Sequence, residues 1–387
     1  MTDKRKILIA IDWYRPASKA GGPIASVENL IDLLSDVDSV EFYVVCGLFD
    51  YGSAEPLDVQ PGVWLTHKKA KVQYWHPKAL GWKQWRRLLR EIQPDCVHTQ
   101  GIWSPRFSIL PLWAAKREKI PVLVSPRGMF TAQSLNQKRT IKWVVGTAMR
   151  LLGAYKNVKF HSTNASETQE IAGFLKGTNP EISEIPNVPR SFGHISQRLG
   201  PKPPKEVNQL RWLFLGRISP EKNPLLLLRA LKSVNAPTQG YFCGGYQDPM
   251  YFQAVLAEIQ QLPKHHKLQY VGEQMAEDLE KQLHQAHVLI NASISENFGH
   301  AMAEGLSAGV PLIVGPNTPW QNLKMQQAGF VADYTEAGYA KAIRFFAEMD
   351  EPTFAAYREG AVRCFQQQCN LDETRAKYLN LYGLTEA

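Results

Sequence analysis

Short apolar runs alternate with longer stretches in which apolar residues recur every three or four positions. In the first half, the apolar runs lie over 6–12, 41–47, 95–99, 121–125 and 157–162. In the second half, they lie over 211–215, 240–243, 268–271, 288–292 and 311–314. Apolar runs of this length that alternate with helical periodicity predict parallel strands covered by helices. We therefore expect an α/β protein.

A break in this alternation divides the chain. Residues 189–209 have no hydrophobic periodicity and are rich in Pro, Gly, Lys and Ser, a composition typical of a linker. We expect an N-terminal Rossmann-like domain over 1–190, a linker over 191–209 and a C-terminal Rossmann-like domain over 210–365. The remaining residues, 366–387, are expected to form a C-terminal helix. The length of 387 residues is consistent with two domains.

Composition narrows the compartment and the partners. The five cysteines form no Cys-x-x-Cys motif and are expected to be reduced thiols. The first apolar run is too short for a signal peptide, and no run is long enough to span a bilayer, so we expect a cytoplasmic protein. The formal net charge is +8, and the excess of cations lies in the first half of the chain. No nucleic-acid-binding motif accompanies it, so we expect no nucleic acid partner and, instead, peripheral contact with the inner face of an anionic membrane.

The densest basic and aromatic segment covers residues 68–90. Trp75, Trp82 and Trp85 are interleaved there with lysines and arginines, and the residues from Ala79 onward have the pattern of an amphipathic helix. Tryptophan beside cations suits the headgroup level of an anionic membrane. The same pattern is also expected of an ordinary surface helix that packs its tryptophans on the domain core. The sequence leaves both interpretations open.

Two carboxylates in the second half are candidates for binding a polar ligand. The strand predicted over 288–292 is followed by Glu296 and then by a helical pattern from His300. Glu296 therefore lies where a strand gives way to a helix N-terminus, which is where α/β proteins hold polar ligands. Glu304 follows eight residues later, a little over two helical turns, so both carboxylates can face one cleft. An acidic helix in contact with solvent is the alternative interpretation.

A basic loop precedes these carboxylates in the chain. The strand predicted over 211–215 ends at Gly216-Arg217, and Lys222 follows just before an apolar helical run. Guanidinium and ammonium groups beside a helix N-terminus suit a diphosphate. A solvated surface loop would have the same composition.

Taken together, Gly216-Arg217 with Lys222, Glu296 with Glu304, and Gly21-Gly22 after the first strand resemble the motifs of the retaining glycosyltransferases of family 4. This family, also called glycosyl transferases group 1, includes enzymes of polysaccharide biosynthesis. The resemblance implies a GT-B fold, in which two Rossmann-like βαβ domains face each other across a cleft and the final helix crosses back to the first domain. It also implies transfer of a hexosyl unit from a UDP- or GDP-linked sugar to a saccharide or lipid-linked acceptor, with no metal and no other cofactor.

The resemblance also assigns roles. Arg217 and Lys222 would stabilise the charge on the departing diphosphate, and Glu296 would contact hydroxyls of the transferred sugar. Glu304 would accept hydrogen bonds from the ribose. The donor would further meet backbone N–H groups of Gly21, Gly22, Asn297, Phe298 and Gly299.

Two residues in the first half are less clearly assigned. His98 ends a predicted strand and could contact the acceptor, or it could be a structural histidine with satisfied hydrogen bonds. Arg127 ends the next strand, where many relatives carry a histidine that positions the sugar. Arg127 could replace that contact, bind an acceptor phosphate, or form an ion pair.

Other functions fit the pattern less well. A sugar-nucleotide epimerase or a phosphorylase of the same architecture, and a catalytically idle glycan-binding subunit, are the alternatives, although intact Arg217, Lys222, Glu296 and Glu304 argue against the idle subunit. A dehydrogenase would need Gly-x-Gly-x-x-Gly after the first strand, and the chain has Gly21-Gly22-Pro23. A hydrolase could use two carboxylates, but a basic diphosphate loop beside them does not suit it.

Overall fold

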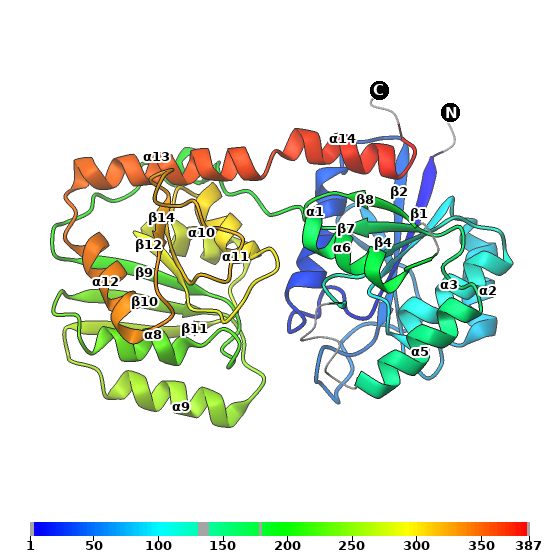
Figure 1. Cartoon of the computed structure of the whole chain (residues 1–387), viewed down its shortest axis with the longest axis horizontal. Helices are drawn as coiled ribbons and strands as arrows, with labels where there is room; N and C mark the ends of the chain where they lie inside the picture. The colour runs from blue at the N-terminus through cyan, green and yellow to red at the C-terminus, as the bar shows by residue number, and fades with distance from the viewer. Residues whose placement is uncertain (1–3, 131–138, 178–179, 385–387) are drawn as a thin grey trace. The chain divides into compact units, whose positions relative to one another are not determined.

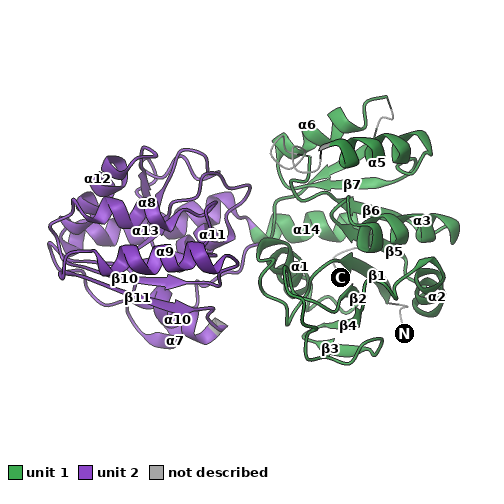
Figure 2. Cartoon of the chain, turned by 90° about the horizontal axis from the view of Figure 1, so that it is seen from below, with its two compact units in different colours: residues 1–188, 371–387 green, residues 189–370 purple. Residues whose placement is uncertain are grey.

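The computed structural model describes residues 4–130, 139–177 and 180–384. The chain forms two compact units, coloured separately in Figure 2. Unit 1 consists of Met1–Val188 together with Leu371–Ala387, and unit 2 consists of Pro189–Asn370. Each unit is an α/β structure built on its own sheet (Figure 1). The predicted fold class, with two sheets of mainly parallel strands, is confirmed.

Unit 1 contains an eight-stranded sheet in the order β3-β4-β2-β1-β5-β6-β7-β8. Neighbouring strands are parallel except for the antiparallel pair β3–β4. The strands are β1 Arg5–Ile11, β2 Val40–Gly47, β3 Leu65–His67, β4 Ala70–Trp75, β5 Cys96–Gln100, β6 Val122–Ser125, β7 Lys159–Ser162 and β8 Glu181–Glu184. Because parallel strands share one direction, the carboxyl ends of β1, β5 and β6 meet at one edge of this sheet.

Helices cover both faces of this sheet. They are α1 Gly22–Leu33, α2 Trp82–Ile92, η1 Pro105–Ile109, α3 Leu110–Arg117, α5 Arg139–Leu151, α6 Ala165–Phe174 and α14 Leu371–Leu381. Side chains of β1 alternate between the two faces, as strand geometry requires. Ile7 and Ile9 belong to the core under α1 and α14, whereas Leu8 and Ala10 belong to the core under α2 and α3.

Unit 2 contains a six-stranded sheet, all parallel, in the order β11-β10-β9-β12-β13-β14. Its strands are β9 Leu210–Leu215, β10 Thr238–Cys243, β11 His266–Gly272, β12 Val288–Asn291, β13 Leu312–Val314 and β14 Gly329–Val331. Its helices are α7 Ile195–Leu199, α8 Pro224–Leu231, α9 Pro249–Gln260, α10 Ala276–Gln285, α11 His300–Ser307, α12 Glu336–Ala347 and α13 Glu351–Gln368. The adjacency of β9 and β12 brings the loops that follow these two strands together.

The segment predicted as a linker is ordered and belongs to unit 2. It includes α7, and Lys205 is buried, with its ammonium donating hydrogen bonds to the carbonyls of Ala347 and Met349, both at 2.8 Å. The end of the chain belongs to unit 1. Arg375 of α14 forms an ion pair with Asp36, with 2.6 Å between nitrogen and oxygen.

Candidate functional site

Lys222 and Glu296 form an ion pair within unit 2, although they are 74 residues apart in the chain. Lys222 lies in the loop after β9, and Glu296 lies in the loop after β12. Because β9 and β12 are parallel neighbours, their carboxyl ends bring the two side chains together. The ammonium of Lys222 donates to Oε1 of Glu296. The sequence predicted both residues as site residues, but it did not predict that they form an ion pair with each other.

Three donors converge on one oxygen of Glu296. Besides Lys222, the hydroxyl of Ser293 donates to Oε1 at 2.7 Å and the amide of Asn291 donates to it at 3.3 Å. Burial by itself would raise the pKa of Glu296, but the charge and hydrogen bond of Lys222 and the two other hydrogen bonds outweigh it and lower the pKa. Glu296 is therefore an ionised carboxylate at neutral pH.

The loop that carries Arg217 and Lys222 is held closely by its neighbour. Gly216, which follows β9, has a φ of 153°, and Gly244, which follows β10, has a φ of 143°. A Cβ on Gly244 would lie 2.1 Å from the carbonyl oxygen of Gly216, so only glycine allows the two loops to approach. Arg217 is half-buried in this loop, and its charge contributes, after hydrogen bonds from Ser219 and from the backbone, to lowering the pKa of Glu221.

Helix α11 begins beside Glu296. Gly299 is the N-cap, with a φ of 78°, and the indole of Trp320 donates to the carbonyl of Phe298 at 3.0 Å, which anchors the turn. Asn297 is exposed, and Glu304 is half-buried on the helix. The loops after β9 and β12 therefore bring Lys222 and Glu296 together on unit 2. Arg217 lies in the same loop as Lys222, Asn297 to Gly299 lie between Glu296 and α11, and Glu304 lies on α11.

In unit 1, Gly21 and Gly22 begin helix α1 at the carboxyl edge of the sheet. Gly21 is the N-cap, with a φ of 64°, and Gly22 is the first helical residue. A Cβ placed on either residue would meet no atom within 4 Å, so the space beside both is open. The N–H of Gly21 already donates to the carbonyl of Ser18 at 3.0 Å. The open space at this helix N-terminus suits an anion or a polar group.

His98 lies inside unit 1. Its side chain is fully buried, with Nδ1 hydrogen-bonded to the hydroxyl of Tyr382 at 2.8 Å. Its Nε2 is hydrogen-bonded to the hydroxyl of Ser125 at 2.7 Å and to the amide of Gln100 at 3.0 Å. Burial, followed by the nearby His161 and Arg127, lowers the pKa of His98, so the ring is neutral. This environment supports the structural interpretation, because no ring atom reaches the surface to contact an acceptor.

Arg127 is connected to the same buried network. Its Nε donates to Gln100 at 2.8 Å, and one terminal nitrogen donates to the side-chain oxygen of Asn187. Its φ of 57° lies in the left-handed region, where a non-glycine residue is uncommon. Both of these contacts are with amide oxygens rather than with a carboxylate, so they do not support the ion-pair interpretation. A contact between Arg127 and a sugar or phosphate stays a proposal.

Asp12 is a carboxylate near the candidate residues of unit 1 that the sequence analysis did not single out. It follows β1 at the same edge as Gly21, and the hydroxyl of Ser104 donates to its carboxylate at 2.7 Å. Burial raises its pKa to about 6, although the hydrogen bond from Ser104 opposes this. A carboxylate directly after a buried parallel strand was the signal that could have identified it.

The segment over 68–90 packs on unit 1 through Trp85, whereas Trp82 is exposed. Trp85 is fully buried and its indole donates to the carbonyl of Arg106 at 2.8 Å. Arg86 and Arg90 both form ion pairs with Glu118. The interpretation of this helix as an interfacial one is therefore weakened, because Trp85 is in the core and two of the cations already have an anionic partner.

Over 4–130, 139–177 and 180–384, no helix is both long enough and apolar enough to cross a membrane. Over the same ranges, histidine, cysteine and acidic side chains form no cluster of three that could hold a metal ion.

Known proteins resemble this chain in part of its sequence and in its fold. Residues 197–360 match the model of the glycosyl transferases group 1 family. No curated protein matches the chain in sequence. HepE of Anabaena, solved in complex with UDP and glucose, is 14% identical with a TM-score of 0.70, covering 98% of this chain and 99% of that one.

Two further structures also resemble the chain over nearly their whole length. Sucrose-phosphate synthase of Thermosynechococcus elongatus is 16% identical with a TM-score of 0.68, covering 98% of each chain. WaaG, a glycosyltransferase involved in lipopolysaccharide biosynthesis, is 15% identical with a TM-score of 0.62, covering 97% of this chain and 99% of that one. Identities this low establish the fold, and the family match covers the residues from Arg217 to Glu304. The chain thus has a GT-B fold and carries a glycosyl transferases group 1 domain.

Proposed function

We propose that the protein is a retaining glycosyltransferase of family 4, which transfers a hexosyl unit from a UDP- or GDP-linked sugar to a saccharide or lipid-linked acceptor in surface polysaccharide biosynthesis. The observation that carries the proposal is the Lys222–Glu296 pair at the adjacent ends of β9 and β12, inside the matched domain. HepE, solved with UDP-glucose, supports the donor class. WaaG, which acts in lipopolysaccharide biosynthesis, supports the acceptor class.

The Lys222–Glu296 pair can bind both the diphosphate and the transferred sugar of the donor. An ammonium has three N–H donors, and Glu296 takes one, so Lys222 can direct the others at phosphate oxygens. The three donors around Glu296 all meet Oε1, which leaves Oε2 for hydroxyls of the transferred sugar. Because the ion pair holds both groups before the donor binds, little reorganisation remains when charge develops on the leaving phosphate.

The surrounding residues complete a donor site on unit 2. Arg217 adds a second cation for the diphosphate, and Glu304 accepts hydrogen bonds from the ribose. Backbone N–H groups of Asn297, Phe298 and Gly299, at the start of α11, hold the sugar. In unit 1, we assign Gly21 and Gly22 to the donor as well, because no side chain there blocks its approach to the backbone at the start of α1.

The proposal includes no metal and no other cofactor, because Arg217 and Lys222 supply the positive charge that the leaving diphosphate requires. The acceptor hydroxyl attacks from the face that the diphosphate leaves, and the departing phosphate takes its proton, so the anomeric configuration is kept. We place the enzyme in the cytoplasm, peripheral to the inner face of the membrane.

Nucleotide binding and product analysis test the proposal. UDP or GDP should raise the melting temperature, because a ligand that binds only the folded protein stabilises it. The matching nucleotide-sugar and acceptor should then release free nucleotide and yield a glycoside with the donor's anomeric configuration, read by NMR. Conversion of the sugar nucleotide without acceptor would identify an epimerase instead. Saccharide binding without any nucleotide release would identify a glycan-binding subunit.

A further inference from the structure

Helix α5 lies on the outside of unit 1 (Figure 2). Several of its large apolar side chains are exposed. Trp143 is 70% exposed and Leu151 is 83% exposed, and Ile141, Val144 and Leu152 are also exposed. Large apolar side chains gathered on one helix are unusual on a surface that meets only water.

Helix geometry shows that this face is opposite to the core. At about 100° per residue, Trp143, Val144 and Leu151 lie on one side of the helix. Met149 is buried on the other side, where a Cβ on Gly146 would lie 2.9 Å from the ring of Phe174. The exposed face therefore does not contribute to the core of unit 1.

Cations flank the apolar face. Between residues 140 and 152 the only charged residues are Lys142 and Arg150. Lys142 is placed over the ring of Trp103 and Arg150 over the ring of Phe174, at 6.0 and 5.9 Å from the ring centroids. Both cations thus lie beside the apolar face rather than within it.

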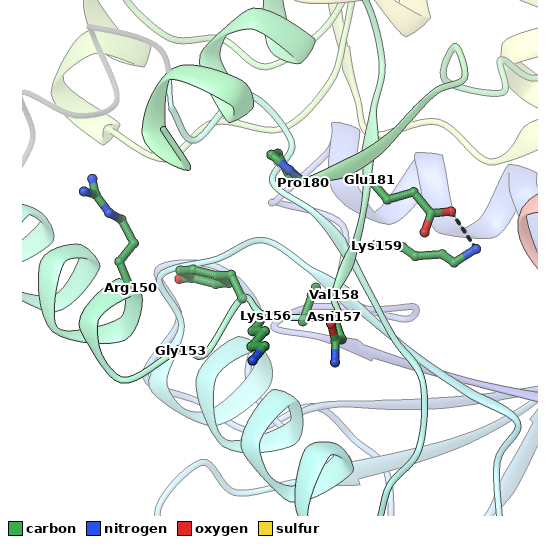
Figure 3. A pocket seen from close by; sticks show the side chains of 9 residues that line it. Arg150, Gly153, Lys156, Asn157, Val158, Lys159, Pro180 and Glu181 are labelled. Carbon is green, nitrogen blue, oxygen red and sulfur yellow. Dashed lines mark ion pairs between the residues drawn. The ribbon is translucent and has the colours of Figure 1, made fainter. Parts of the chain in front are cut away.

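A basic cavity follows the end of α5 (Figure 3). Its volume is about 680 Å³, and Arg150, Lys156 and Lys159 are among the side chains that line it. Glu181 also lines it and forms an ion pair with Lys159 at 2.7 Å. Lys156 and Lys159 flank the start of β7, so the cavity is at the opposite end of the sheet from Gly21 and Gly22.

We propose that the exposed face of α5 and this basic cavity form a docking surface for an anionic phospholipid bilayer, with the cavity taking a phosphate-bearing headgroup. An amphipathic helix with tryptophan on its apolar face and cations beside it lies in the membrane interface. The positive charge next to the apolar face matches anionic headgroups. A symmetric pair of two copies of this chain would instead put Arg150 and Lys156 of both copies into one interface, without an anionic partner from the other copy's cations.

The inference rests on the proposed function and deepens it, because docking would bring the enzyme to the membrane that holds a lipid-linked acceptor. It also moves the expected membrane contact from the segment over 68–90, whose Trp85 is buried, to α5. Neither α5 nor the basic cavity is part of the proposed donor site on unit 2.

Vesicle co-sedimentation of the full chain, without donor or acceptor, tests the docking surface. The protein should bind vesicles of phosphatidylcholine with phosphatidylglycerol, and bind phosphatidylcholine alone much less. The double variant Trp143→Ser with Leu151→Ser should bind anionic vesicles at least about tenfold more weakly, because it removes the inserted apolar side chains. Arg150→Gln with Lys156→Gln should weaken vesicle binding to a similar extent at low salt. At high salt, this difference between the variant and the wild type should disappear.

The matched control changes two equally exposed apolar residues on unit 2, Met250→Ser with Met325→Ser, and should leave vesicle binding unchanged. Equal binding of the α5 variant and the control would overturn the inference. So would a wild-type dimer, found by sedimentation velocity without lipid, that the α5 variant abolishes. Transfer to a soluble acceptor is measured separately, so a failure of the proposed function is distinguishable from a failure of docking.

Discussion

Replacing Lys222 by Met tests how the ion pair holds the candidate site. Methionine keeps most of the length and apolar stem of the side chain but removes the ammonium that donates to Glu296. In the wild-type protein, the pKa of Glu296 is lowered because Lys222 and two hydrogen bonds outweigh burial. Without Lys222, burial should dominate and the pKa should rise above its usual value.

The expected loss of stability follows from the burial of the pair. Breaking a fully buried ion pair costs about 3–5 kcal/mol. The Lys222 side chain is 25% exposed and that of Glu296 is 12% exposed. Ser293 and Asn291 still donate to the carboxylate. We therefore expect the free energy of unfolding to fall by about 1–3 kcal/mol at pH 7.5.

The pH dependence has a defined sign. In the wild-type protein, a lowered pKa gives a stabilising contribution that is present above the unfolded pKa of 4.5 and is lost as the pH falls. In the Lys222→Met variant, a raised pKa gives a cost that grows as the pH rises above 4.5. The difference between the two proteins should therefore be smaller at pH 5 than at pH 7.5.

Urea unfolding at both pH values measures this difference, followed by tryptophan fluorescence, to which Trp212 and Trp320 contribute from the core of unit 2. Glu296→Gln and the double variant complete a thermodynamic cycle, and the pair should show a coupling of about 1 kcal/mol or more. Equal losses at the two pH values, together with additive effects in the cycle, would refute the reasoning.

Three further predictions address separate groups. Arg217→Ala should slow transfer by roughly 10²-fold or more while changing the urea midpoint little, and unchanged turnover would remove its diphosphate role. Glu304→Gln should mainly raise the donor KM, whereas Glu296→Gln should mainly lower kcat; steady-state kinetics that show the reverse would exchange their roles. Asp12→Asn should raise the free energy of unfolding at pH 7.5 by about 1–3 kcal/mol, because the pKa of Asp12 is raised to about 6 and its cost grows between about pH 4 and 6. Urea unfolding at pH 4 and 7.5 checks this, and a gain that is equal at both would contradict it.

The sequence predicted most of the buried strands of both sheets but missed β3, β4, β8 and β14. Buried parallel strands are continuous apolar runs, and β1 and β12 were recognised for that reason. Strand β3 has three residues, and β8 reads Glu-Ile-Ser-Glu with little burial, so neither has a strand pattern. Both are at the edge of their sheet, where fewer neighbours impose a pattern.

The same distinction applies to the candidate site. Motif spacing placed Lys222 and Glu296 each at the end of a strand, but their contact depends on β9 and β12 being neighbours in the sheet, which local sequence does not encode. The environment of His98 could not be predicted from local sequence either, because its hydrogen-bond partner Tyr382 lies 284 residues away in the chain.

Unit 1 is formed by two separate segments of the chain, and this affects how the protein folds during its own synthesis. All of unit 2 is translated before α14, although α14 belongs to unit 1. Until the last residues leave the ribosome, His98 and His161 lack the hydroxyls of Tyr382 and Tyr378, and one face of the first sheet lacks the helix that covers it. Domains generally fold as units during synthesis. The unit that is begun first is therefore the one completed last, and a chain cut short near its end would carry a finished unit 2 beside an unfinished unit 1.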